Sequence, residues 1–233
     1  MDKQEIIAAL RADLAHAAAE RLIAKNDPAI GAARTALKRF QSERMARTHA
    51  DFLKSPDSHA AATFFLDDLY GPQDLTKRDA DLERVVSAME RMLPVPALHI
   101  IAKAIALDAL SESLDAAMAA RLGNEFAEED YIGAYRVVGT QAERARQIDL
   151  VELVGNSLCD LIAIPMIATT MKMMRGPARL AKLGELQNFL ERGFSAFKSM
   201  KDPRAFVEKV VQRERHILDN LYAGRPDPFT IAS

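Results

Sequence analysis

The chain has 233 residues, of which 49% are hydrophobic and 27% charged, so it can bury a core and is not a disordered protein. Its 31 basic and 33 acidic side chains give a net charge of −2, which argues against a general nucleic-acid-binding surface. The single cysteine, Cys159, excludes an internal disulfide and a cysteine-based zinc site, and its apolar neighbours predict a buried thiol.

Targeting and membrane-spanning segments are not expected. The start of the chain lacks the basic and apolar regions of a secretory signal peptide. The most apolar stretch, residues 150–174, contains Glu152, Asp160 and Pro165, and a membrane span rarely carries so many polar groups. We therefore expect a buried core helix here, no transmembrane segment and a cytoplasmic protein.

Helical periodicity begins at once. The first predicted helix covers residues 3–24, because Asp2 and Glu5 have the spacing of a capping box. An Asp-Pro pair begins a second helix over residues 28–53, since proline at the first helical position sacrifices no hydrogen bond. A Ser-Pro pair repeats this signal before a third helix, which we expect to end at Gly71.

The fourth, fifth and sixth helices follow at short intervals. We expect them over residues 76–92, 97–122 and 128–138. Two prolines separate the fourth from the fifth, and Gly123 ends the fifth, since glycine readily adopts the left-handed conformation of a helix C-terminus.

The last part of the chain holds the longest predicted helix. A capping box of Thr140 and Glu143 begins it, and Pro165 should kink or break it, because proline removes one backbone hydrogen bond. Gly176-Pro177 is expected to begin the next helix, and an Asp-Pro pair opens the final one, over residues 203–223.

Eight or nine helices with short connections predict an all-α fold, a compact multi-helix bundle. No convincing linker divides them. We expect a single domain over residues 1–233, and the proline-rich break at residues 94–96 is the one candidate for a subdivision.

The motifs of common enzymes are absent from the sequence. No Glu-x-x-His pair supports a di-iron site, no Gly-x-Ser-x-Gly supports a hydrolase nucleophile, and no glycine-rich loop supports nucleotide binding. Asp13, His16 and Glu20 share one helical face, but no second set of metal ligands accompanies them, so we interpret them as a solvated ion pair. We expect no metal and no cofactor.

Charged side chains on apolar helices give a first candidate site. Asp108, Glu112 and Asp115 form one acidic stripe on the fifth helix, which must be solvated or matched by cations. The ligand-binding candidates that accompany Asp108 are Tyr131, Tyr135, Arg136 and Arg146, with Arg144 and Gln147 close by in the sequence. Arginines beside tyrosines would clamp a carboxylate or phosphate, and an internal salt-bridge network is the alternative.

A second candidate lies around Gly176-Pro177, where a helix N-terminus is expected. The bases there are Lys172, Arg175, Arg179 and Lys182. Together with a helix N-terminus they would bind a phosphate, an acidic partner or a lipid headgroup, and ordinary surface charge is the alternative. Four methionines in residues 166–174 would fill gaps in the core or line a pocket beside Pro165.

Several segments resemble the signature of a bacterial family of uncharacterised, all-helical proteins. The segments that carry the resemblance are Phe64-Phe65-Leu66-Asp67-Asp68-Leu69-Tyr70-Gly71-Pro72, Asp74, Arg78-Asp79-Ala80-Asp81, Tyr135-Arg136, Arg146-Gln147-Ile148 and Leu186-Gln187-Asn188-Phe189-Leu190-Glu191-Arg192-Gly193-Phe194. The likeness spans most of the chain, and it implies no known activity.

From the sequence we expect a helical protein that binds a partner and has no catalytic machinery of its own. The partner would be a small molecule, a protein or a second copy of the chain through an alanine-rich helix. An enzyme acting on an anionic substrate, held by Asp108, Tyr135, Arg136 and Arg146, is the rival hypothesis. A carrier of hydrophobic ligands using Phe64, Phe65 and the methionines is the third.

Overall fold

The computed structural model describes residues 2–69 and 76–231, and among these it shows helices and connecting loops but no strand. The all-α prediction is confirmed, although the described residues form eleven α-helices and one π-helix (η1) rather than eight or nine helices. The elements are α1 (Lys3–Asn26), α2 (Pro28–Thr48), α3 (Ala50–Lys54), α4 (His59–Phe64), η1 (Phe65–Leu69), α5 (Thr76–Met92), α6 (Val95–Leu122), α7 (Glu128–Val137), α8 (Gln141–Ala163), α9 (Ile167–Leu180), α10 (Gly184–Lys198) and α11 (Pro203–Tyr222).

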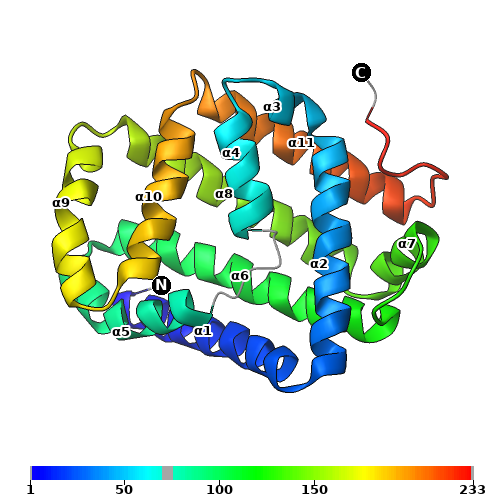
Figure 1. The fold of residues 1–233 in the computed structure, drawn as a ribbon, viewed down its shortest axis with the longest axis horizontal. Coiled ribbons are helices and arrows are strands. Elements are labelled where there is room, and N and C mark those ends of the chain that lie inside the picture. Colours follow the sequence, from blue (N-terminus) through cyan, green and yellow to red (C-terminus); the bar gives the residue numbers. More distant parts are fainter. Residues whose placement is uncertain (1, 70–75, 232–233) are drawn as a thin grey trace.

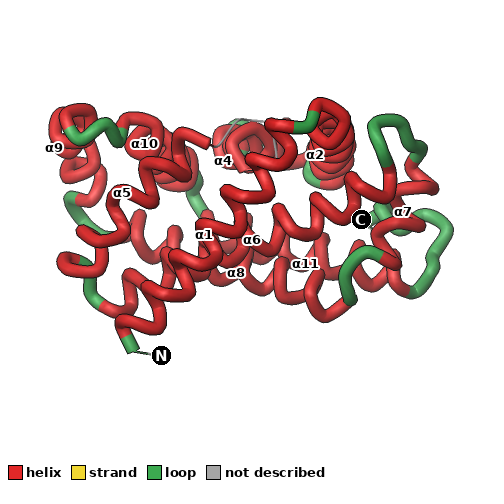
Figure 2. Tube along the Cα trace, turned by 90° about the horizontal axis from the view of Figure 1, so that it is seen from below, coloured by secondary structure: helices red, strands yellow, loops and turns green. Residues whose placement is uncertain are grey.

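The helices are arranged in two layers. In Figure 1, α2, α4, α10 and α9 stand in a row at the front, while α1, α6, α8 and α11 run across behind them. Figure 2 views the same front row end-on and the back layer lengthwise. Helix α6 is the centre of the back layer, because it packs against α1, α2, α7 and α8, and α8 in turn packs against α11.

Most helix ends follow the local signals of the sequence. Asp2 and Glu5 form a capping box at α1, and Thr140 and Glu143 form another at α8, so each pair satisfies two backbone N–H groups that a helix start leaves unpaired. Gly123 ends α6 with a φ of 71°, a left-handed conformation that favours glycine.

Two early boundaries differ from the prediction. The second helix ends at Thr48, and α3 follows as a separate short helix. The break falls at His49, whose ring is buried and lies 3.1 Å from a carboxylate oxygen of Glu214. The third helix begins at His59 after a turn, and its predicted end at Gly71 lies outside the described residues.

The chain bends sharply between α8 and α9, as Pro165 predicts. Helix α8 ends at Ala163, Met166 has a φ of 69°, and the two helices differ in direction by 97°. The predicted buried core helix over residues 150–174 is therefore wrong, because the bend carries its second half to the edge of the molecule (Figure 1).

The predicted helix start at Gly176-Pro177 is also wrong. Pro177 lies inside α9, three residues before the helix ends, and the next helix begins at Gly184. Pro177 lacks the N–H that would bond the carbonyl of Met173 one turn earlier, so α9 continues through it with one backbone hydrogen bond fewer. No single described helix is long and apolar enough to span a membrane. The bent pair α8–α9 has the required length and hydropathy only when its two helices are taken together.

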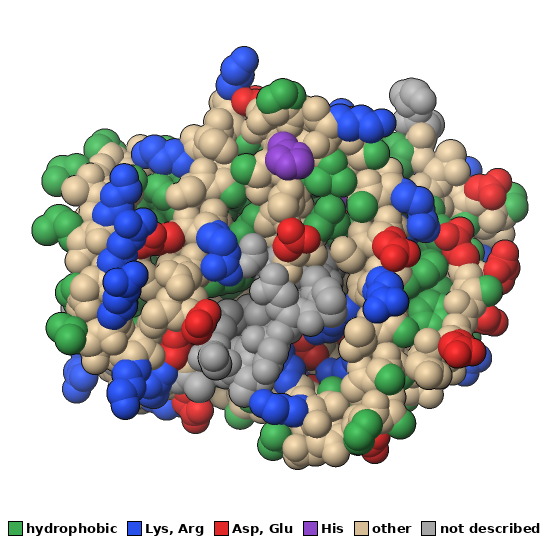
Figure 3. All heavy atoms as spheres, in the orientation of Figure 1, with side chains coloured by type: hydrophobic (Ala, Val, Ile, Leu, Met, Phe, Trp, Pro, Cys, Tyr) green, Lys and Arg blue, Asp and Glu red, His purple; other side chains and the backbone are tan. Residues whose placement is uncertain are grey.

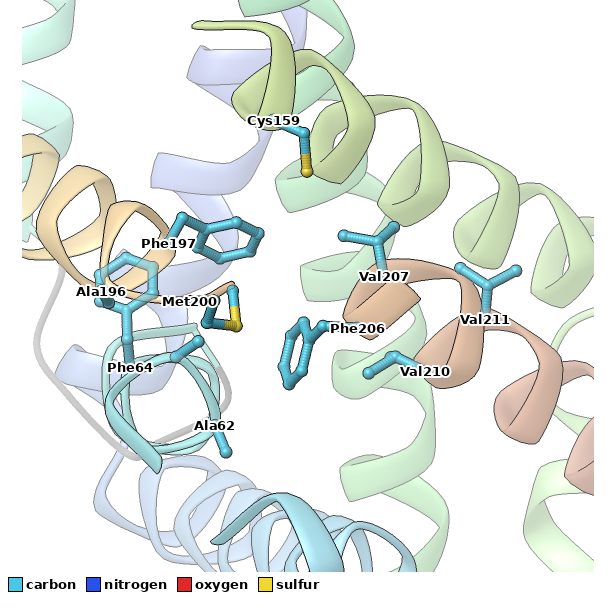
Figure 4. Close-up of a cluster of buried hydrophobic side chains, with 11 residues drawn as sticks. Ala62, Phe64, Cys159, Ala196, Phe197, Met200, Phe206, Val207, Val210 and Val211 are labelled. Atoms are coloured by element: carbon cyan, nitrogen blue, oxygen red, sulfur yellow. The ribbon is translucent and has the colours of Figure 1, made fainter. Parts of the chain in front are cut away.

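The main apolar cluster joins the two layers. Figure 4 shows Phe64 of α4, Phe197 of α10 and Phe206 of α11 gathered around one centre, with Met200 between them. Cys159 of α8 belongs to the same cluster and is only 4% exposed, which confirms the predicted buried thiol. Phe64 is thus packed within the core and is separate from the exposed methionines of α9.

Two glycines allow the helices around this cluster to approach closely, and alanine at either should destabilise the fold. A Cβ atom at Gly155 would lie 2.9 Å from Val207, and one at Gly193 would lie 2.8 Å from Phe64. We expect Gly155→Ala and Gly193→Ala each to lower the free energy of unfolding by about 1–3 kcal/mol, measured by urea denaturation. Gly133→Ala is the control, because nothing lies within 4 Å of its Cβ, and it should gain about 0.5–1 kcal/mol. Equal effects at all three positions would contradict this packing.

Candidate functional site

The acidic stripe of α6 is matched by cations inside the protein. Glu112, which is 4% exposed, accepts hydrogen bonds from Arg34 at 2.7 Å and from Lys38 at 3.0 Å. Arg21 of α1 lies 3.3 Å from Glu112 and donates a hydrogen bond to Asp108 at 2.7 Å. The network therefore ties α6 to α1 and α2, whereas the sequence pointed to α7 and α8 as the partners.

The side chains of Gln41, Tyr131 and Tyr135 continue this network toward α7. Gln41 donates a hydrogen bond to Asp115 at 2.9 Å, and burial raises the pKa of the Asp115 carboxyl. The rings of Tyr131 and Tyr135 lie 5.9 Å apart, and burial raises the pKa of both phenols. Both tyrosines are therefore uncharged at neutral pH.

Arg144 is the arginine that contacts these tyrosines. Its guanidinium carbon lies 4.1 Å from the centre of the Tyr135 ring, and Nη2 donates to the carbonyl oxygen of Val138 at 3.3 Å. The residue is 3% exposed, and its Nε has no hydrogen-bond partner among the described residues. The two arginines named among the sequence candidates lie elsewhere: Arg136 donates to the carbonyl oxygen of Leu221 at 2.6 Å, and Arg146 is exposed.

A second buried ion pair fastens α11 to α2. Nη1 of Arg44 lies 2.6 and 2.8 Å from the two carboxylate oxygens of Glu214, and the Arg44 guanidinium lies 5.9 Å from the Phe229 ring of the C-terminal tail. Burial alone would raise the pKa of Glu214, but the Arg44 charge and the hydrogen bonds from His49 and Arg44 outweigh it and lower that pKa to about 2.

The side chains of the first candidate site are thus engaged with different partners. Asp108 pairs with Arg21, Tyr135 stacks with Arg144, and Arg136 holds the end of α11. Since Asp108 and Glu112 are paired with cations of α1 and α2, we assign this network to packing the helices together.

Neutralising Glu112 should destabilise the fold strongly. Glu112→Gln removes the charge that Arg34 and Lys38 face, and we expect a loss of about 3 kcal/mol or more in the free energy of unfolding at pH 7. Glu125→Gln, at an exposed loop position, is the control and should change it by less than about 0.5 kcal/mol. Urea denaturation measures both, and a similar small effect for Glu112→Gln would refute a structural role for the network.

The Glu214 pair predicts a specific pH dependence. The pKa of Glu214 falls on folding from 4.5 to about 2, so the charged group stabilises the fold above pH 4.5, and this contribution disappears as the pH falls toward 2. We expect Glu214→Gln to cost on the order of 3 kcal/mol at pH 7 and little at pH 2. Denaturation of both proteins across this pH range measures the difference, and a cost that does not depend on pH would contradict the pairing.

The second candidate site is a pocket between α9 and α10. The pocket has a volume of about 180 Å³ and is lined by Arg175, Arg179, Gly184, Gln187, Asn188 and Glu191. Nε and Nη2 of Arg175 donate to Glu191 at 2.8 and 2.5 Å, and Gln187 donates to the same carboxylate at 2.7 Å. These hydrogen bonds lower the pKa of Glu191 to about 2, so its pair with Arg175 stays ionised at neutral pH.

Arg179 is the uncompensated cation of this pocket. Its side chain is exposed, and within residues 2–69 and 76–231 no hydrogen bond or ion pair engages the guanidinium. Arg175 and Arg179, two of the candidates named from the sequence, both line this pocket. The helix N-terminus near them belongs to α10, at Gly184, where the backbone N–H of Leu186 donates to a carboxylate oxygen of Asp81 at 3.3 Å.

An exposed apolar row runs along α9 beside the pocket. Met166, Met173 and Leu180 repeat every seven residues and are 74%, 73% and 89% exposed. Seven residues are close to two helical turns, so Met173 and Leu180 lie in one line along the outer face of α9, and Met166 precedes the helix in a left-handed conformation. Figure 3 shows a column of Lys and Arg side chains over this edge of the molecule, with apolar side chains at its outer margin.

The charge of α9 is one-sided. The helix contains Lys172, Arg175 and Arg179 and no acidic residue, and Lys182 follows directly after it. Met173 and Met174, which the sequence suggested as core or pocket residues, are exposed next to these bases. We refer to Met166, Met173 and Leu180 with the neighbouring bases as the α9 face. Across the described residues, no group of three His, Cys, Asp or Glu side chains is placed to hold a metal ion.

Comparison with known proteins places the chain in a family. A family model described as a domain of unknown function (DUF8198) matches residues 20–228, so the chain belongs to this family. Neither the curated proteins nor the solved structures include a match to the chain. The expected membership of an uncharacterised family is confirmed, while the bacterial origin and the signature segments remain predictions.

Proposed function

We propose that this member of the DUF8198 family is a binding protein that docks on the surface of an anionic membrane through the α9 face. The observation that carries the proposal is the combination of an exposed apolar row with bases and no acid on one helix. An amphipathic helix of this kind lies in the plane of the interface, with its apolar side chains below the headgroups and its bases among them.

The position of α9 suits such a surface. The helix forms one end of the molecule and packs only against neighbours on one side, chiefly α10 (Figure 1). A bilayer requires no complementary shape, so a protruding ridge of Met166, Met173 and Leu180 can enter it directly. Long basic side chains such as Lys172 and Arg179 can reach the headgroups from the flank of the ridge.

Charge favours an anionic surface over a second copy of the chain. Two α9 faces brought together would oppose base to base, since α9 carries no acid. An anionic leaflet instead attracts each nearby base by about 1 kcal/mol. The net charge of the whole chain is −2, so the basic α9 face would also orient the molecule at the membrane. Anionic lipids line the cytoplasmic leaflet, which accords with the cytoplasmic location predicted from the sequence.

The membrane proposal predicts that an acidic residue in the apolar row weakens vesicle binding. Leu180→Asp and Met173→Asp place a carboxylate at positions that are 89% and 73% exposed, so the fold should be unaffected. We expect the wild type to sediment with vesicles of phosphatidylcholine and phosphatidylserine, and each variant to bind about tenfold more weakly. Added salt should weaken the wild-type interaction, because it screens the bases.

Leu22→Asp is the matched control. Leu22 is an exposed leucine of α1, 55% exposed and outside the α9 face, so its substitution should leave vesicle binding unchanged.

Light scattering of the same proteins tests the predicted homodimer. A dimer that Leu180→Asp dissociates, together with no binding to anionic vesicles, would overturn the membrane proposal and favour a second copy as the occupant of the α9 face.

A further inference from the structure

The pocket between α9 and α10 has an excess of hydrogen-bond donors. Glu191 is the one acid in its lining, and it is occupied by Arg175 and Gln187. The charges of Arg175 and Glu191 cancel, which leaves the guanidinium of Arg179 as the net charge of the pocket. A pocket with one uncompensated guanidinium attracts an anion.

Glu191 also fixes the geometry of the pocket. Its two oxygens bind Nε and Nη2 of Arg175, so the guanidinium is held in one orientation while Nη1 takes part in none of these hydrogen bonds. Arg175 and Arg179 are four residues apart and lie on the same side of α9. Two like charges at this spacing repel each other, and an anion between them and α10 would relieve that repulsion.

The donors come from several directions. Arg179 and Arg175 face the pocket from α9, and the side chain of Asn188 and the first residue of α10, Gly184, line it from the other side. A phosphate group has several acceptor oxygens and is bound well by guanidinium and amide groups together. A carboxylate has two oxygens and uses fewer of these donors.

We propose that this pocket binds a phosphate monoester group. The group could belong to a lipid headgroup or to a soluble phosphate, because both present the same oxygens. The lipid form rests on the proposed function, since the α9 face would bring the pocket to the depth of the headgroups. The soluble form does not depend on it.

Calorimetric titration of the full-length protein with inorganic phosphate tests the site itself. We expect the wild type to bind phosphate, and Arg179→Gln to weaken binding about tenfold or more, as loss of a charged hydrogen-bond donor does. Arg39→Gln, at an exposed arginine of α2 away from the pocket, should bind like the wild type. Wild-type protein that does not bind phosphate, or equal weakening by both substitutions, would overturn the proposal.

Vesicles distinguish the two sources of the phosphate. Phosphatidic acid presents a phosphate monoester and phosphatidylserine does not, so vesicles of matched surface charge isolate the headgroup. If the source is a lipid, the wild type should prefer phosphatidic acid over phosphatidylserine, and Arg179→Gln should lose this preference and bind both kinds of vesicle equally. Phosphate binding without this preference identifies a soluble ligand.

The failures of the two proposals are separable. Leu180→Asp changes the apolar row and leaves the pocket lining intact, so it should bind inorganic phosphate like the wild type while binding vesicles more weakly. Binding to phosphatidylserine vesicles without any phosphate binding would overturn the pocket proposal and leave the membrane proposal standing. Phosphate binding without binding to phosphatidylserine vesicles would overturn the membrane proposal alone.

Discussion

The buried carboxylate of Glu112 is the constraint on which the arrangement of the helices depends. A charge removed from water is costly unless cations and hydrogen bonds surround it, and Glu112 obtains both from Arg34 and Lys38. Arg34 also donates a hydrogen bond to Glu20 of α1 at 2.5 Å, so one guanidinium joins three helices. A slide of α2 along α6 would separate these groups, which gives the front layer a defined position on the back layer. The apolar clusters alone would tolerate more displacement.

The capping and turn signals could be predicted from the sequence because they are local. The capping box of Asp2 and Glu5 and the break at Pro165 each involve residues within a few positions of one another, and the structure contains both. The sequence also indicates that the acidic stripe of α6 must be solvated or matched by cations. Its partners could not be identified, because Arg34 is 78 residues away from Glu112, and a single sequence carries no signal for that contact.

The choice of arginine at the first candidate site could have been improved from helical periodicity. Arg144 precedes the inward-facing Gly155 and Cys159 at helical spacings, so it lies on the packed face of α8, whereas Arg146 is turned away by two positions. At α9 the sequence misled about burial rather than about which residue faces inward. An apolar stretch predicts burial, but the 97° bend after α8 depends on how the rest of the chain packs, and it exposes side chains such as Met173 that composition alone would place in the core.

The bend also separates the stable part of the molecule from the proposed binding part. The ion pairs of Glu112 and Glu214 and the core around Phe197 hold the back layer and α2 together, and none of them involves α9. Helix α9 is instead attached through contacts such as Arg175 with Glu191, which lie at the surface and stabilise a fold only weakly. Substitutions on its outer face can therefore change binding without changing the core.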